Sequence, residues 1–184
     1  GTGNSSTSVL KKMAPSDDEA LGKLRLTVST PFIGTVDKKE SVSDSLTTKW
    51  VALFGAGVQY GGPSADDPEG GKAVYVVDIR DGTPEKELTH DDLGMVVAPI
   101  SAEASPRPMK IGKFYLGDNR GAVFEGDLTS PLKKDWKLER VFTPGNSGND
   151  INGIPFAVEV GMLKNSKWLF WGTGDPDGLF GSQT

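Results

Sequence analysis

The chain has 184 residues, which is enough for one domain with a sizeable core, and 36% of them are hydrophobic. Its net charge of −5 argues against nucleic acid as a partner, because phosphate binding requires clustered Lys and Arg. The absence of cysteine excludes disulfides, thiolate nucleophiles and cysteine metal sites, and no apolar run approaches the roughly 20 residues that span a membrane. The 24 glycines and 12 prolines indicate many turns and argue against long helices.

The chain is predicted to begin with a tail followed by two strands. Residues 1–22 open with Gly, Ser, Thr and Asn and are interpreted as a flexible tail. No leader peptide is recognisable at Gly1, so we expect that an export signal has been removed or lies outside this sequence. Alternating apolar residues predict a strand at residues 24–28, and β-branched residues predict another at 30–36.

The next two predicted strands complete a first unit, at about residues 24–90. Residues 49–55 form a strongly apolar run, which predicts a strand buried on both faces. The valine-rich residues 73–79 predict the following strand, which ends in a turn at 80–82. Residues 59–71, rich in Gly, Pro and Asp, are predicted to form a surface loop between these two strands.

The same order of elements returns twice, in a second unit at about residues 94–145 and a third at about residues 150–184. The strands of the second unit are predicted at residues 95–100, 114–117, 122–128 and 136–142. Those of the third unit are predicted at residues 156–160 and 167–172. The Gly- and Asn-rich residues 143–153 are predicted to connect the second unit to the third.

Glycines and prolines mark the period of this repeat. The second strand of each unit ends near a glycine, and these glycines lie 62 and 55 residues apart: Gly55, Gly117 and Gly172. A proline opens each unit, at spacings of 68 and 56 residues: Pro31, Pro99 and Pro155. Periods of this length, made of strands, are typical of a β-propeller or a related β-array.

The predicted fold class is therefore all-β, with β-propeller blades of antiparallel four-stranded sheets. Residues 23–184 would hold about two and a half blades, whereas a closed propeller needs at least about four. We expect the chain to be part of a larger propeller and a fragment of a longer protein. Completion by another chain, or a different packing of the units, are the alternatives.

Three phrases in this order resemble the propeller of the PilC/PilY family of type IV pilus tip proteins. They are WVALFGAG at 50–57 leading to VYVVD at 74–78, FYLGDNRG at 114–121 leading to VFEGDL at 123–128, and WLFWGTGD at 168–175. The resemblance covers about residues 24–180 and implies a quinoprotein-like C-terminal propeller of an adhesin or pilus biogenesis protein. Members of that family often carry a calcium loop before the second phrase, but residues 102–110 here hold one carboxylate, so that site is not carried over.

Acidic loops elsewhere are the candidate calcium sites, because calcium takes six to eight oxygen ligands from such loops. The candidate metal ligands are Asp66, Asp67, Glu69, Asp175 and Asp177. A further acidic stretch combines Asp150 with Asn149 and Asn152. The alternative for all of them is turn formation, since Asp and Asn readily bond to their own backbone.

No catalytic constellation and no cofactor-binding residue is predicted. His90 is the sole histidine, which excludes a histidine-based triad, and it is expected to be solvent-exposed. Asp78 and Asp127 follow apolar strands and are expected to cap tight turns rather than to act as bases. Residues 117–121 are expected to form a hairpin turn rather than a phosphate loop, because no helix pattern follows them.

The aromatic residues near the C-terminus are expected to be buried. In a strand, Trp168 and Phe170 share one face while Leu169 and Trp171 share the other. Large apolar residues on both faces predict that this strand lies between neighbouring sheets. An exposed sugar-binding platform is the alternative.

The leading functional hypothesis is a non-enzymatic surface protein, part of a type IV pilus adhesin or assembly factor. Binding would reside in loops such as 59–71 and 143–153, held by rigid strands. The expected partners are other pilus proteins, the remaining blades of the parent protein, and a host or surface ligand. The expected location is the bacterial cell surface or the pilus tip. The alternatives are a quinoprotein-type dehydrogenase, with a calcium-held quinone, and a secreted propeller scaffold unrelated to pili.

Overall fold

A computed structural model describes residues 21–58, 68–103, 107, 109–145, 153–164 and 166–174. These residues form three antiparallel sheets, two of four strands and one of two strands, joined by turns and a short 3-10 segment. The predicted all-β class, with four-stranded sheets like propeller blades, is confirmed. No helix in the described ranges is long and apolar enough to cross a bilayer.

The first sheet contains four strands in sequence order. They are β1 (Phe32–Lys38), β2 (Thr47–Gly55), β3 (Val74–Asp78) and β4 (Pro84–Leu88). β2 is exposed at its start, where Trp50 faces solvent, and buried on both faces at its end, where Leu53 and Phe54 point in opposite directions. β3 is buried along its whole length, as its four apolar residues predict.

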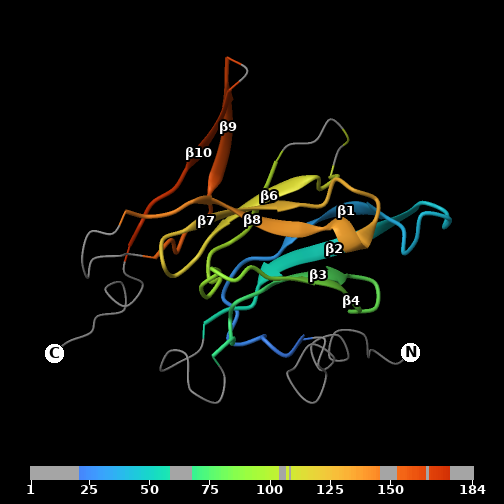
Figure 1. The fold of residues 1–184 in the computed structure, drawn as a ribbon, viewed down its shortest axis with the longest axis horizontal. Helices are drawn as coiled ribbons and strands as arrows, with labels where there is room; N and C mark the ends of the chain where they lie inside the picture. Colours follow the sequence, from blue (N-terminus) through green and yellow to red (C-terminus); the bar gives the residue numbers. More distant parts are fainter. Residues whose placement is uncertain are drawn as a thin grey trace, which may run out of the picture.

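The second sheet repeats this order with a shorter first strand. Its strands are β5 (Ser101–Ala102), β6 (Lys113–Gly117), β7 (Val123–Asp127) and β8 (Lys137–Phe142). The 3-10 segment η2 (Lys133–Asp135) precedes β8. The third sheet is a hairpin of β9 (Glu159–Leu163) and β10 (Ser166–Phe170), and it projects away from the two larger sheets (Figure 1).

Three predicted strands differ from the observed ones. Residues 24–28 form one isolated bridge, between Leu26 and Val58, and residues 95–100 form no strand. The strand predicted at 156–160 begins only at Glu159. β4 was missed by the sequence analysis, because its sequence PEKEL is charged and becomes a strand only by pairing with the buried β3.

The main core lies between the two four-stranded sheets, which stack face to face (Figure 1). The first sheet contributes residues such as Val51, Leu53 and Val76, and the second contributes Phe114 and Phe124. All five side chains are almost fully buried. The large apolar area removed from water between these sheets is the main source of stability for the fold.

Smaller cores cover the outer faces of the same two sheets. Leu21 and Leu24 pack on Phe54 and Tyr75, on the face of the first sheet that points away from the second. Tyr115, Val123, Ile154 and Val158 form a third core with the hairpin residues Val160, Leu169 and Trp171. The layers therefore follow the chain: an N-terminal segment, the first sheet, the second sheet and the hairpin.

Candidate functional site

Most of the predicted calcium ligands lie outside the described residues: Asp66, Asp67, Asp175 and Asp177, together with Asn149, Asp150 and Asn152. Glu69 is described, in an exposed turn. Its carboxylate forms ion pairs with Lys72, at 3.1 Å, and with Lys23, at 3.9 Å. Within the described ranges no group of three His, Asp or Glu side chains is placed to hold a metal ion. Among the described residues, the ion-pair partners of the Glu69 carboxylate are therefore the cations Lys23 and Lys72.

Asp78 and Asp127 cap the turns that follow their strands, as the sequence predicts. Oδ1 of Asp78 accepts the backbone N–H of Arg80 at 2.9 Å, and Oδ1 of Asp127 accepts that of Thr129 at 2.8 Å. Burial favours the neutral form of Asp78, but the hydrogen bonds from Lys49 and Arg80 outweigh it and lower the pKa of this carboxyl. Both aspartates serve turn structure through these hydrogen bonds.

The predicted hairpin turn at 117–121 is confirmed, and Asp118 is its centre. Oδ1 of Asp118 accepts the backbone N–H groups of Arg120 and Ala122, each at 2.9 Å. Oδ2 accepts the N–H of Gly94 at 2.8 Å, so the same carboxylate joins the turn to the segment around Gly94, 24 residues earlier in the chain. Burial raises the pKa of Asp118, while the three N–H donors act in the opposite direction.

Backbone hydrogen bonds link the turns at this end of the stacked sheets into a continuous series. The N–H of Val96 donates to the carbonyl of Gly71, and the N–H of Asn119 donates to that of Met95. Farther along the chain, the N–H of Ile154 donates to the carbonyl of Asp118. Each unit is thus tied to the next at the end where the glycines of the repeat lie. This rigid end is the candidate binding surface, because the predicted binding loops 59–71 and 143–153 both reach it at described residues, Gly71 and Gly153.

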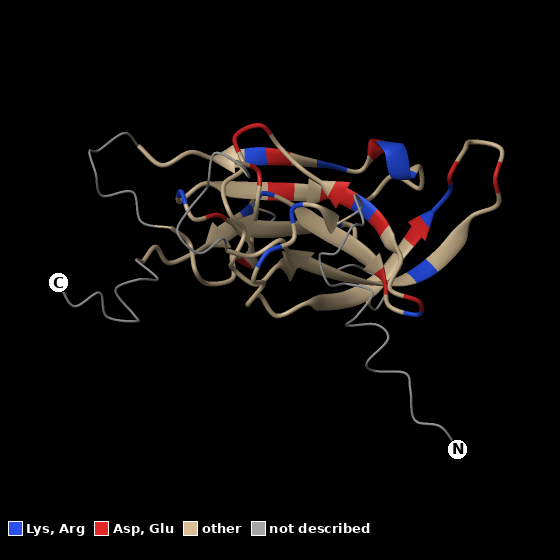
Figure 2. Cartoon of the chain, turned by 90° about the horizontal axis from the view of Figure 1, so that it is seen from below, with Lys and Arg blue, Asp and Glu red and all other residues tan. Residues whose placement is uncertain are grey.

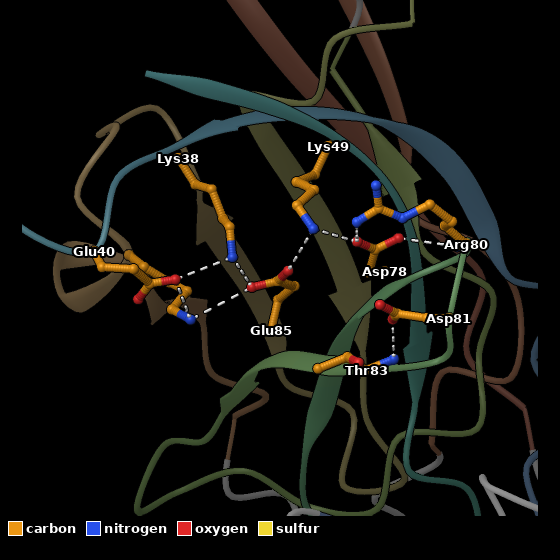
Figure 3. A network of polar contacts seen from close by, with 9 residues as sticks. Lys38, Glu40, Lys49, Asp78, Arg80, Asp81, Thr83 and Glu85 are labelled. Atoms are coloured by element: carbon orange, nitrogen blue, oxygen red, sulfur yellow. Dashed lines mark hydrogen bonds and ion pairs between the residues drawn. The ribbon is translucent and has the colours of Figure 1, made fainter. Parts of the chain in front are cut away.

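A second polar network lies at the opposite end of the first sheet (Figure 3). Glu85 of β4 is almost fully buried and forms ion pairs with Lys38, with Lys49 at 3.8 Å and with Lys133 of η2 at 3.4 Å. Lys133 also pairs with Glu40 at 3.0 Å. The network therefore fastens the first sheet to the 3-10 segment of the second.

The charges in this network are balanced, which argues against a catalytic role. Its carboxylates each face at least one cation, and the pKa of Glu40 is lowered by the ammonium groups of Lys133 and Lys38. Burial acts to lower the pKa of Lys38, but its hydrogen bonds with Glu85 and Glu40 raise it overall. The pKa of Glu40 is thus moved down and that of Lys38 is moved up, whereas a general acid or base needs a pKa moved toward neutrality.

A third network attaches the hairpin to the second sheet. Nζ of Lys167 in β10 donates to Oη of Tyr115 at 2.8 Å and to Oε2 of Glu103 at 3.0 Å. The Tyr115 hydroxyl in turn donates to Glu125 at 2.6 Å. Burial and the Glu125 carboxylate raise the pKa of Tyr115 to about 12, and the phenol stays neutral at any physiological pH.

His90 is half-buried rather than solvent-exposed, which corrects the sequence prediction. Its ring lies edge-on against Phe124, with ring centroids 5.4 Å apart. Nδ1 accepts the backbone N–H of Asp92 at 3.1 Å, which fixes the orientation of the ring. The histidine therefore packs against the core and caps a local turn.

The distribution of charge gives no single basic face. Figure 2 shows basic and acidic positions interspersed along the described strands, for example Lys137, Glu139 and Arg140 in β8. Neighbouring opposite charges pair locally, as Lys137 does with Glu139 at 2.5 Å. Along the described strands in this view, the mixed charges form no continuous positive stripe of the kind that follows a nucleic acid backbone.

The aromatic residues of β10 are not buried on both faces, contrary to the prediction. Leu169 and Trp171 pack on the second sheet, but Trp168 and Phe170 are exposed on the outer face. Phe142 of β8 contacts Trp171, with ring centroids 5.0 Å apart, so the buried face is held by aromatic packing. The exposure of the outer face arises because no described residue of this chain lies over it.

Sequence reasoning missed Asp118, Glu85 and Lys167 as organising residues. Their partners are distant in sequence: Gly94 lies 24 residues from Asp118, and Tyr115 lies 52 residues from Lys167. One signal was present for Asp118, because it directly follows the repeat glycine Gly117. For Glu85 and Lys167 the local sequence holds no comparable signal.

Comparison with known proteins finds a likeness in structure rather than in sequence. No protein-family model matches the chain, and no curated protein matches its sequence. The C-terminal domain of Pseudomonas aeruginosa PilY1 matches it with a TM-score of 0.62 at 14% sequence identity, over 83% of this chain. The chain spans about a third, 33%, of the length of that PilY1 structure. The resemblance predicted from the three phrases is thus confirmed at the level of architecture, and the chain has the fold of the PilY1 C-terminal domain.

Proposed function

We propose that this chain belongs to a non-enzymatic, pilus-associated surface protein that binds its ligand through the loops at the glycine end of its sheets. The observation that carries the proposal is the match of fold with the PilY1 C-terminal domain over 83% of the chain. The order of the three sequence phrases supports it independently, because a shared fold alone does not require shared phrases at corresponding strands.

The packing of the sheets suits a binding module. Buried strands hold the turns around Gly71, Asp118 and Gly153 in fixed positions, and backbone hydrogen bonds link these turns. Loops on such a rigid scaffold can vary in sequence without loss of the fold, which is how many recognition surfaces are built. The exposed side chains of Glu69 and Arg120 lie on two of these turns and are the first residues to test.

The test is a gene replacement in the organism of origin. The double variant E69A/R120A of the full gene product should leave protein level and thermal melting unchanged, since both side chains are exposed, and should reduce adhesion or surface piliation several-fold. A matched control is K137A/E139A, an exposed ion pair on the solvent edge of β8 away from these turns. Deletion of the gene should abolish the same phenotype.

Three outcomes contradict the proposal. Unchanged piliation and adhesion in the deletion strain would favour a secreted propeller scaffold unrelated to pili. A bound quinone, seen as an absorbance band in the purified gene product together with alcohol oxidation, would favour the dehydrogenase alternative. If the deletion strain loses adhesion or piliation but the double variant E69A/R120A behaves as wild type, the protein binds through another face.

A further inference from the structure

An irregularity in the first sheet gives the carboxylate of Glu85 its unusual position. Val76 of β3 pairs with Lys86 of β4, but the next residue, Val77, pairs with Pro84, so Glu85 is an extra residue on the β4 side. Extra residues of this kind re-aim side chains relative to the regular alternation of a strand. The Glu85 side chain is only 4% exposed, and a carboxylate is rarely buried to this extent unless cations accompany it.

Three ammonium groups from three different elements accompany Glu85. Lys38 of β1 and Lys49 of β2, the latter at 3.8 Å, belong to the first sheet, and Figure 3 shows both converging on the carboxylate. Lys133, at 3.4 Å, comes from η2, the segment that precedes β8 of the second sheet. Glu85 is therefore shared between the two sheets.

The neighbouring carboxylates cannot take over this role. Lys49 already donates to Asp78 at 2.5 Å. Lys38 and Lys133 both lie 3.0 Å from the same oxygen of Glu40, whose side chain is 60% exposed, so water and salt weaken that attraction. If Glu85 were neutral, three ammonium groups would face two carboxylates, and like charges would be held together at a poorly hydrated place.

The segment η2 is the part of this cluster that is free to move. None of its three residues is buried. Two backbone hydrogen bonds also join this segment to the first sheet, from the N–H of Lys39 to the carbonyl of Pro131 at 2.6 Å and from the N–H of Lys133 to the carbonyl of Lys39 at 3.3 Å. Trp136 directly follows η2 and is 2% exposed, so a shift of η2 would uncover a large aromatic side chain.

We propose that Glu85 and Lys133 form an acid-released clasp, which holds η2 against the first sheet while the Glu85 carboxylate is ionised. When this carboxylate binds a proton, the three ammonium groups lose their shared partner, η2 moves into water with Lys133, and Trp136 is uncovered. Backbone hydrogen bonds elsewhere between the units carry no charge and stay closed, such as those donated by Ile111 to Thr35 at 2.8 Å and by Asn119 to Met95 at 3.0 Å. The inference is independent of the proposed binding function.

The test follows exchange of the Trp136 indole N–H with deuterated water by NMR. This N–H donates to the Ser130 carbonyl at 2.8 Å, and its signal is identified among the four tryptophans by replacing the other three singly with Phe. At pH 7 the variant E85Q should exchange it faster than wild type by a factor of about 10 or more. The matched control is E87Q on the same strand, because Glu87 pairs with Lys23 at 3.5 Å, away from η2. E87Q should leave the indole rate unchanged.

The acid dependence is read from the ratio of the E85Q rate to the wild-type rate. At about pH 3, below the ordinary glutamate pKa of about 4.3, this ratio should fall to about one, because the carboxylate is then neutral in wild type as well. The amides of Ile111 and Asn119 report the rest of the contact between the sheets and should exchange alike in both proteins at each pH. They are chosen because their acceptors are backbone carbonyls, which do not titrate.

Three results would overturn the proposal: an E85Q indole rate equal to that of wild type at pH 7, a ratio that stays high in acid, or acceleration of the Ile111 and Asn119 amides together with the indole. The last result would mean that Glu85 stabilises the whole fold. Should E85Q fail to fold, the pair K133M and K134M decides. K133M removes the clasp cation and should quicken indole exchange at pH 7, whereas its exposed neighbour K134M should not, and equal rates in the two would exclude the clasp.

Discussion

Asp118 shows at the scale of one residue how this fold uses a buried charge. Its carboxylate has no exposed surface and accepts three backbone N–H groups from two separate segments. Burial raises its pKa, so its ionised form is penalised relative to the unfolded chain. Its contribution to stability is therefore largest at low pH, below the pKa of the unfolded state, and it declines as the pH rises through the folded pKa.

The variant D118A should destabilise the protein. It leaves the N–H groups of Gly94, Arg120 and Ala122 without their acceptor, and a buried unsatisfied donor costs about 1–3 kcal/mol. The control D127A removes a cap on the exposed Thr129, where water can replace the lost bond, and should cost about 1 kcal/mol or less. Urea denaturation at pH 7 measures both, and equal losses would contradict the assigned role of Asp118.

Asp78 should make the protein sensitive to acid. Lys49 and the Arg80 N–H lower its folded pKa, so the stability it contributes is present above the unfolded pKa of about 4 and is lost as the pH falls through the folded pKa. The variant D78N should be less stable than wild type at pH 7 and should lose less on acidification. Melting temperatures at pH 7 and at about pH 3 test this, and parallel losses in the two proteins would exclude the linkage.

At the scale of elements, hydrogen bonds and ion pairs from lysine side chains hold the hairpin and the 3-10 segment to neighbouring elements. The Lys167 ammonium ties β10 to Tyr115 and Glu103, and the Lys133 ammonium ties η2 to Glu85 and Glu40. The hairpin buries less apolar surface than either four-stranded sheet, since only one of its faces is packed. It should therefore open locally before the two large sheets do.

The variant K167M should loosen the hairpin without unfolding the sheets. It removes two hydrogen bonds at a partly exposed site, worth about 1 kcal/mol together, which corresponds to a roughly fivefold loss of protection. Amide hydrogen exchange at residues 166–170 should quicken by that factor, while exchange in β3 and β7 stays as in wild type. K137M, which removes an exposed ion pair, is the control and should change neither. A uniform rise in exchange would mean that Lys167 stabilises the whole fold and not the hairpin in particular.

At the scale of the molecule, we expect the two four-stranded sheets to unfold together as one cooperative body. Their shared core draws on β2 and β3 from one side and on β6, β7 and β8 from the other, so neither sheet keeps its buried face without its partner. The layers continue in chain order, and each covers the next. Such stacks derive their stability from the interfaces between neighbouring units.

The variant L53A should therefore weaken both sheets at once. Leu53 is fully buried between them, and a leucine truncated to alanine in a core costs about 2–5 kcal/mol. Near-UV circular dichroism and far-UV circular dichroism should report the same lowered midpoint, as in a single transition. V42A, at an exposed position, should have no effect. Two separate transitions in L53A would show that the sheets unfold independently.

Strands rich in apolar residues were predictable from the sequence, and β2, β3, β6 and β7 lie close to their predicted bounds. β4 was not, because the charged PEKEL sequence has no strand preference apart from its pairing with β3. Residues 24–28 alternate as strands do, yet they form one isolated bridge, with Leu26 and Val28 exposed, and the apolar residues 95–100 form no strand. An apolar pattern in the sequence does not specify whether the backbone of the segment pairs with another strand.

The sequence by itself determined the all-β class, the repeated order of strands, the hairpin turn at 117–121 and the turns capped by Asp78 and Asp127, because these depend on local side-chain alternation and on bonds between near neighbours. Only the tertiary structure decided which faces are covered. Residues distant in sequence meet in the hydrogen bonds of Lys167 and in the ion pairs around Glu85. They also meet where Val96 packs closely on Gly55 and where Ile154 packs closely on Gly117. Contacts of that kind depend on how whole sheets stack, and no local pattern encodes them.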